Sequence, residues 1–221
     1  NGEYHIDGEK KLTERNATIV YSGGDDVFIV GAWNEVIELS IDLQEKFKKY
    51  TQGTLSISSG IGIYECTYPI GAIANETGEM EAESKRMPEK DSVTFMDDGE
   101  THLINELEIC DGTYRWEELY KSVLGEKYDV IQDFLGESDE RGMSFLYRML
   151  ELIRNQKEKI NFARFVYLLS RLEPDKEGEK KEKYRKFSRK MYQWVQSEKD
   201  CRELKTAINL YAYMHREKGA H

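Results

Sequence analysis

Two short hydrophobic runs, Ala17-Thr18-Ile19-Val20-Tyr21 and Val27-Phe28-Ile29-Val30, limit the possible folds of this chain more than any other feature. Both runs are rich in β-branched and aromatic residues, which favour strands. The five residues between them, Ser22-Gly23-Gly24-Asp25-Asp26, are small or acidic, and Gly and Asp are preferred in tight turns. The pattern therefore predicts a β-hairpin.

The rest of the first hundred residues alternates predicted helices with predicted strands. Asn34 is a plausible N-cap for a helix that ends before Gly53. The apolar residues of this helix recur at helical spacing: Val36, Leu39, Leu43 and Phe47. Strands are predicted at residues 54–63 and around 92–95, with a helix at about 71–86 between them. The predicted order is β-β-α-β-α-β, a mixed α/β pattern.

The second half of the chain has a different character. Residues 1–100 carry a net charge of −11, whereas residues 101–221 carry +1. Beyond the polar stretch at residues 97–100, apolar residues recur at helical spacing in four successive segments, which predicts a small helical bundle. The four segments are residues 145–153, 162–172, 184–194 and 204–214. We therefore expect two domains, residues 1–98 and 99–221, in an α+β protein.

Composition excludes several classes of protein. No apolar run approaches the ~18 residues that a membrane span requires, so no membrane contact is expected. Cys66, Cys110 and Cys201 lie far apart, which argues against a zinc ribbon or disulfide framework and indicates the reducing cytoplasm. The net charge of −10 disfavours a freestanding nucleic-acid binder, because such binding depends on Lys and Arg contacts to phosphates.

The hairpin turn contains the residues of the sequence that most specifically indicate a functional site. Gly23 and Gly24 permit unusual backbone angles and leave room for a phosphate to approach the main chain. The adjacent carboxylates of Asp25 and Asp26 suit a hard cation such as Mg²⁺, which fills its remaining positions with water and substrate phosphates. The alternative is that these four residues form only a solvated turn.

The longer string from Ile19 to Trp33 resembles the second palm domain of the large catalytic subunit of type III CRISPR effector complexes. The resemblance covers most of the chain, and residues 194–216 favour the Csm-type branch, subtype III-A. Further matching segments are residues 47–51, 55–61, 68–70, 85, 90–95, 116–119, 145–150, 163–172 and 207–211.

The resemblance implies a palm fold akin to diguanylate cyclases and nucleotidyl polymerases. It implies that ATP is converted to cyclic oligoadenylate when the complex binds target RNA, with two Mg²⁺ or Mn²⁺ ions held by Asp25 and Asp26. The implied partners are the remainder of the same subunit, other protein subunits of the complex, ATP, and guide and target RNA through the complex. The nucleotide-binding residues that it implies are Ser22, Gly23, Gly24, Lys85 and Lys90.

The resemblance also implies that the chain is a fragment. The family's nuclease domain, first palm domain and zinc-bearing insertion have no counterpart in these 221 residues. The first strand of the second palm, with its own metal-binding Asp, is expected upstream of residue 1. We therefore expect a ferredoxin-like mixed sheet that lacks its first strand, and no cyclic product from this chain alone.

Several alternatives stay open from the residues. Lys85 and Lys90 are either phosphate contacts or ordinary solvated lysines. The basic segment 176–190 either meets RNA or an acidic partner, or forms the solvated face of a helix. The chain could instead belong to a diguanylate-cyclase-like enzyme acting on GTP, or serve as a palm scaffold without catalysis.

Overall fold

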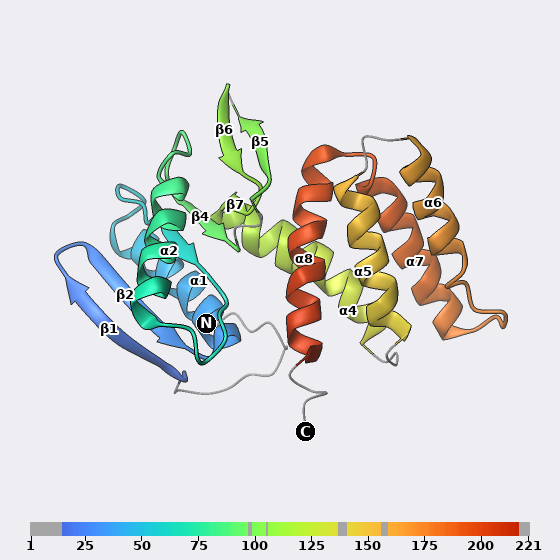
Figure 1. Cartoon of the computed structure of the whole chain (residues 1–221), viewed down its shortest axis with the longest axis horizontal. Helices are drawn as coiled ribbons and strands as arrows, with labels where there is room; N and C mark the ends of the chain where they lie inside the picture. Colours follow the sequence, from blue (N-terminus) through green and yellow to red (C-terminus); the bar gives the residue numbers. More distant parts are fainter. Residues whose placement is uncertain (1–14, 97–98, 105, 137–140, 156–158, 217–221) are drawn as a thin grey trace. The chain divides into compact units, whose positions relative to one another are not determined.

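The computed structural model describes residues 15–96, 99–104, 106–136, 141–155 and 159–216 (Figure 1). Contacts divide the chain into two compact units, Asn1–Tyr120 and Lys121–His221. The first unit mixes strands and helices, and the second is helical. No helix in the described ranges is long and apolar enough to cross a membrane.

The predicted hairpin is confirmed. Strand β1 (Ala17–Gly23) pairs antiparallel with β2 (Asp26–Gly31), and Gly23 lies opposite Asp26, so the turn has two residues. The register shifts between Ile19 and Tyr21, which marks a β-bulge at Val20.

The helix after the hairpin, α1 (Trp33–Tyr50), is confirmed but begins earlier than expected. The N-cap position belongs to Ala32, so the assignment of Asn34 as N-cap is wrong. The reason lies in the hairpin: the backbone N–H of Ala32 donates to the carbonyl of Asn16 at 2.8 Å, which holds Ala32 extended where the helix starts.

A second, mixed sheet has the order β3-β4-β7. Strand β3 (Ser59–Ile61) runs parallel to β4 (Ser92–Phe95), which pairs antiparallel with β7 (Thr113–Arg115). The strand expected at residues 54–63 is therefore only three residues long. One reason is that the carbonyl of Ile57 accepts a hydrogen bond from the indole of Trp116 at 2.9 Å instead of joining the ladder.

Helix α2 (Ile70–Ser84) packs closely on β3. A Cβ added to Gly60 would overlap the carbonyl of Thr77 and lie 2.7 Å from the backbone nitrogen of Glu81. Only glycine permits this approach of strand and helix. The order β-β-α-β-α-β is thus confirmed for the first six elements.

The first unit extends beyond the expected boundary at residue 98, which itself lies outside the described residues. A hairpin of β5 (Thr101–Ile104) and β6 (Leu107–Cys110) follows β4, and the chain then returns as β7 to pair with β4. The short helix α3 (Trp116–Glu118) follows β7. The pairing of β7 with β4 joins segments about twenty residues apart, which periodicity along the chain does not reveal.

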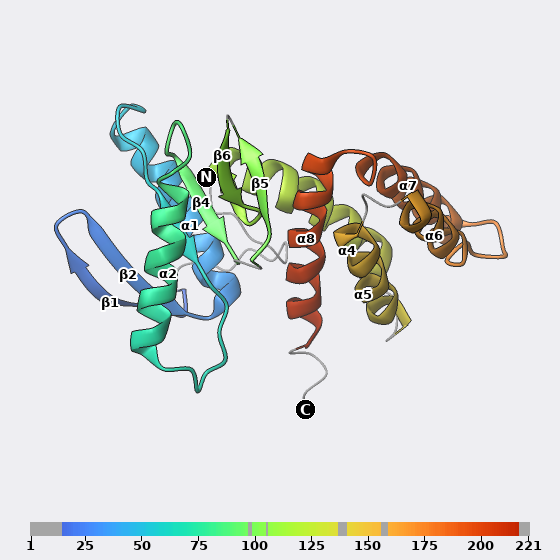
Figure 2. The same cartoon turned by 45° about the horizontal axis from the view of Figure 1, so that its top comes forward.

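The second unit is the expected helical bundle. The four predicted segments correspond to α5 (Arg141–Arg154), α6 (Lys159–Ser170), α7 (Glu179–Trp194) and α8 (Glu198–Arg216). A π-helix (Leu119–Tyr128) and α4 (Asp129–Leu135) precede them and were not predicted. Figures 1 and 2 show α8 beside α4 and α5, which it contacts.

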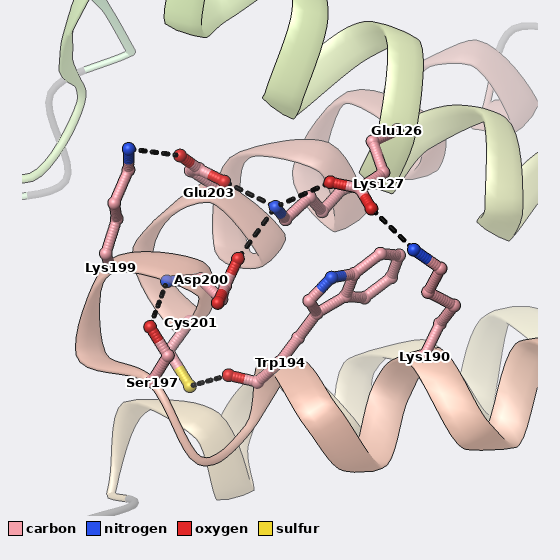
Figure 3. Close-up of polar contacts among 9 residues, drawn as sticks. All are labelled: Glu126, Lys127, Lys190, Trp194, Ser197, Lys199, Asp200, Cys201 and Glu203. Atoms are coloured by element: carbon pink, nitrogen blue, oxygen red, sulfur yellow. Dashed lines mark hydrogen bonds and ion pairs between the residues drawn. The ribbon is translucent and has the colours of Figure 1, made fainter.

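Charged side chains join the π-helix to α7 and α8 (Figure 3). Lys127, whose side chain is 3% exposed, contacts Asp200 at 2.8 Å and Glu203 at 2.6 Å. Its ammonium group lies 5.1 Å from the ring centroid of Trp194, and Lys190 lies over the same ring. Glu126 bridges the two lysines, at 3.2 Å from Lys127 and 2.7 Å from Lys190.

The basic segment 176–190 is largely neutralised within the chain. Among the described residues, five of its eight lysines and arginines pair with carboxylates on α7 itself, on the preceding loop and on neighbouring helices. This pairing favours the interpretation as a helix face over an RNA-binding stripe. The paired residues are Lys181, Lys183, Arg185, Lys186 and Lys190.

Candidate nucleotide site at the hairpin turn

The β1–β2 turn presents two carboxylates to solvent. Asp25 lies in the turn itself and Asp26 is the first residue of β2. Both residues are exposed, and neither has an ion-pair partner among the described residues. Of the two turn residues, only Gly24 has a positive φ, at 64°. The turn therefore needs a glycine at this position and holds two adjacent acids at the end of a short hairpin.

The two glycines differ in the space beside them. A Cβ added to Gly24 would meet nothing within 4 Å. A Cβ added to Gly23 would overlap the hydroxyl of Tyr21 and lie 2.8 Å from its Cζ. Gly24 thus leaves the main chain open to a phosphate, as expected of both glycines, whereas the ring of Tyr21 fills the space beside Gly23.

The structure brings Lys85 into electrostatic range of the two carboxylates. Lys85 occupies the C-cap of α2, and its side chain is 51% exposed. Its ammonium group forms an ion pair with Glu81 one turn earlier. The hydrogen bond to Glu81 raises the pKa of Lys85, and the charges of Asp26 and Asp25 raise it further. Lys85 and the hairpin turn therefore form one charged cluster from two elements.

Lys90 and Ser22 are less well placed to contact a nucleotide bound at the turn. Lys90 lies in the exposed turn before β4, with φ of 51°, beside Asp91, which binds Gln44 and Lys48 on α1. Within the described residues Lys90 has no ion pair. Ser22 pairs with Val27, and successive strand residues face opposite sides, so it points away from the Asp26 face of the hairpin. Nucleotide contacts by Lys90 and Ser22 stay predictions.

The residues of the turn supply some, but not all, of the ligands that a divalent cation requires. Carboxylate oxygens are the ligands that Mg²⁺ and Mn²⁺ prefer, and Mg²⁺ sites for nucleotides commonly use one or two protein carboxylates plus water and phosphate. In the described part of the chain, no group of three or more His, Cys, Asp and Glu side chains forms a metal cluster. Asp25 and Asp26 would therefore share the ions with ligands from substrate, water or another segment.

Family models match both units of the chain. Residues 3–94 match the model described as Cas10/Cmr2, second palm domain. Residues 132–217 match the model described as the second helical domain of the Cmr2 subunit of the CRISPR RNA silencing complex. The fold and the site thus define a class of protein in which a palm unit with a two-carboxylate turn precedes a helical unit. The chain belongs to the Cas10/Cmr2 family of CRISPR effector subunits.

Curated relatives are named CRISPR system single-strand-specific deoxyribonuclease Cas10/Csm1 of subtype III-A. The protein of Mycobacterium tuberculosis is 40% identical over 96% of this chain and 25% of its own length. The protein of Streptococcus thermophilus is 34% identical over 91% of this chain and likewise 25% of its own length. The chain therefore spans about a quarter of the relatives that it matches.

Solved structures share the fold. A crystal structure of a Csm1–Csm4 cassette with one ATP has a TM-score of 0.57 and 26% identity over 88% of this chain, and 27% of that chain is covered. The Csm1 structure from T. onnurineus has a TM-score of 0.64 and 21% identity over 90% of this chain and 28% of its own, which supports the fold alone. The expected palm and helical architecture is confirmed.

Proposed function

We propose that the palm unit converts ATP to cyclic oligoadenylate as part of a type III effector subunit that has bound target RNA. The observation that carries the proposal is the charged cluster at the turn: Asp25 and Asp26 exposed and adjacent, with Lys85 within their electrostatic range. A related Csm1, 26% identical, was solved with ATP, which supports this choice of nucleotide. Metal-held carboxylates beside a lysine suit the transfer of a nucleotidyl group.

Each residue of the cluster has a defined part in this reaction. Two Mg²⁺ or Mn²⁺ ions held by Asp25 and Asp26 would lower the pKa of the attacking 3'-hydroxyl and neutralise the leaving pyrophosphate. The carboxylates hold negative charge at a fixed place, because the two-residue turn restricts the backbone. Gly24 leaves the main chain open to the substrate, and Lys85 offers a cation to the triphosphate. Catalysis on this account is mainly positioning and charge stabilisation.

The proposed partners follow from the fraction of its relatives' length that this chain covers. Because this chain matches a quarter of each of two relatives, we propose that the remainder of the subunit completes the palm sheet and its metal ligands. Related Csm1 chains were solved with Csm4, which supports contact with other effector subunits. Guide RNA and target RNA act through the assembled complex. The deoxyribonuclease activity in the relatives' names is not assigned to these residues.

The test is Asp25→Ala with Asp26→Ala in the complete effector complex, supplied with target RNA, Mn²⁺ and labelled ATP. We expect no cyclic product, with assembly and RNA binding unchanged, because both carboxylates are exposed and contribute little to packing. A matched control is Asp175→Ala, an exposed acid in the helical unit. Undiminished product from the double variant would refute the site.

The same assay separates the two alternatives. Cyclic product from GTP but not from ATP would indicate a diguanylate-cyclase-like enzyme. No product from either nucleotide, with the complex intact and target RNA bound, would indicate a palm that serves only as scaffold.

A further inference from the structure

Tyr21 is exposed on the same face of the hairpin as Asp26. Directly opposed residues of an antiparallel pair share a face, as do residues two apart on one strand. Tyr21 is two residues from Gly23, and Gly23 lies opposite Asp26. The β-bulge at Val20 shifts the register next to Tyr21, and such bulges commonly re-aim side chains beside functional sites.

The phenol of Tyr21 reaches the end of the hairpin. A Cβ added to Gly23 would overlap its hydroxyl oxygen and lie 2.8 Å from Cζ and 3.3 Å from Cε2. Opposed residues of a pair have Cβ atoms about 5 Å apart, so the hydroxyl lies on the same side of the hairpin end as the Cβ of Asp26. Gly23 itself does not have a positive φ. A side chain at position 23 would therefore displace the ring of Tyr21 from the end of the hairpin.

The hydroxyl of Tyr21 has no hydrogen-bond partner within the part of the chain that the structure describes, and the residue is 57% exposed. A ring that served only to cover Gly23 would need no hydroxyl at this place. We propose that Tyr21 contacts the substrate, donating its hydroxyl hydrogen to an oxygen of the metal-bound triphosphate. This inference rests on the proposed function and adds a substrate-contacting residue to the site.

The test uses Tyr21→Phe and Tyr21→Ala in the complete complex with target RNA. The phenylalanine keeps the ring over Gly23 and removes only the hydroxyl, so a packing role predicts no change. We expect Tyr21→Phe to raise KM for ATP about tenfold with kcat changed less than about twofold, since a hydrogen bond to a charged oxygen is lost. The control is Tyr50→Phe, because Tyr50 is 88% exposed at the end of α1.

A second measurement identifies the group contacted. Inorganic tripolyphosphate with Mg²⁺ carries the phosphates without ribose or base, and its inhibition constant should rise in Tyr21→Phe by the same factor as KM for ATP. Tyr21→Phe behaving as wild type while Tyr21→Ala is impaired would show a packing role and overturn the proposal. An unchanged inhibition constant for tripolyphosphate in Tyr21→Phe would also overturn it.

Failure of the proposed function can be distinguished from failure of this inference. If the wild-type complex makes no cyclic oligoadenylate, direct calorimetric binding of Mg²⁺ and tripolyphosphate still compares wild type with Tyr21→Phe. Equal affinities there would overturn the contact, whereas about tenfold weaker binding by the variant would support it without any turnover.

Discussion

Gly23 and Gly24 differ both in backbone angle and in what a side chain at each position would meet. Gly24 has φ of 64°, a conformation that costs other residues roughly 1–2 kcal/mol, with open space beside it. Gly23 adopts no such angle but lies under the ring of Tyr21. Only Gly24 therefore combines the backbone freedom and the open space that a phosphate contact requires.

Lys85 is the lysine whose placement fits the proposed site. We expect Lys85→Ala to raise KM for ATP about tenfold in the complete complex, and Lys85→Glu to raise it further by placing a third carboxylate near Asp25 and Asp26. The measurement is the initial rate of cyclic product against ATP concentration. Lys46→Ala on α1, another exposed lysine, is the control.

An unchanged ATP dependence in both Lys85 variants would show that this lysine is merely solvated and paired with Glu81. Folding should not confuse the result, because substitutions of exposed side chains usually change stability by about 0.5 kcal/mol or less.

At the scale of elements, the buried lysine of the π-helix stabilises the corner between α7 and α8 (Figure 3). Burial acts to lower the pKa of Lys127, but the hydrogen bonds and charges of Asp200 and Glu203 outweigh burial and raise it. Glu203 is 1% exposed, so removal of Lys127 leaves a buried carboxylate without this cation. The corner depends on charges that the apolar spacing of α7 and α8 did not reveal.

We expect Lys127→Met to lower the free energy of unfolding by about 3–5 kcal/mol, because breaking a buried ion pair from one side leaves a buried charge. Chemical denaturation of the complete subunit, followed by a probe in the helical unit, measures this loss. Lys186→Met is the control: Lys186 pairs with Asp133, but the two side chains are 62% and 42% exposed. Equal stability of the two variants would contradict the assigned role of Lys127.

The same network predicts a pH dependence. Burial acts to raise the pKa of Glu126, but Lys190 and Lys127 outweigh burial and lower it below its ordinary 4.5. This contribution to stability is present above pH 4.5 and is lost as the pH falls through the lowered pKa. The contribution of Lys127, whose pKa is raised, is present below its ordinary 10.5 and is lost as the pH rises through the raised pKa. Denaturation of the helical unit across pH, compared between wild type and Glu126→Gln, measures the stability that is lost at acid pH. This loss should be smaller in the variant.

At the scale of the whole molecule, the described residues of the palm unit form three separate sheets: β1–β2, β3–β4–β7 and β5–β6. Among the strands that the structure describes, β2 pairs with β1 alone and β3 pairs with β4 alone. Each of these two strands therefore has one unpaired edge within the described part of the chain. Unpaired strand edges leave N–H and C=O groups without ladder partners and invite association. Several large hydrophobic residues of the β1–β2 hairpin are also exposed: Ile19, Val20, Tyr21 and Val27.

We expect a strand from the remainder of the subunit to lie between β2 and β3, and residues 1–221 alone to make no cyclic oligoadenylate. Hydrogen exchange of the backbone amides of β2 and β3 should slow by at least about tenfold in the complete subunit relative to the isolated chain. Amides in the middle of α7 provide the control, because that helix satisfies its own backbone. A monomeric isolated chain with cooperative unfolding and measurable cyclisation of ATP would contradict the expectation.

Local sequence determined the hairpin, the order of the first six elements and the four long helices of the bundle. Each of these depends on residue type, periodicity or turn chemistry among residues close together in the chain, as in the β-branched run of β1 and the apolar stripe of α7. The adjacent acids Asp25 and Asp26 were recognisable for the same reason, because the turn that presents them is a local structure.

Only the tertiary structure decided which distant residues meet. The pairing of β7 with β4, the approach of Lys85 to the carboxylates and the partners of Lys127 all join segments separated along the chain. The length of β3 likewise depended on a hydrogen bond from Trp116. Sequence periodicity describes one element at a time, whereas these interactions depend on how elements pack against each other, as at Gly60 against α2.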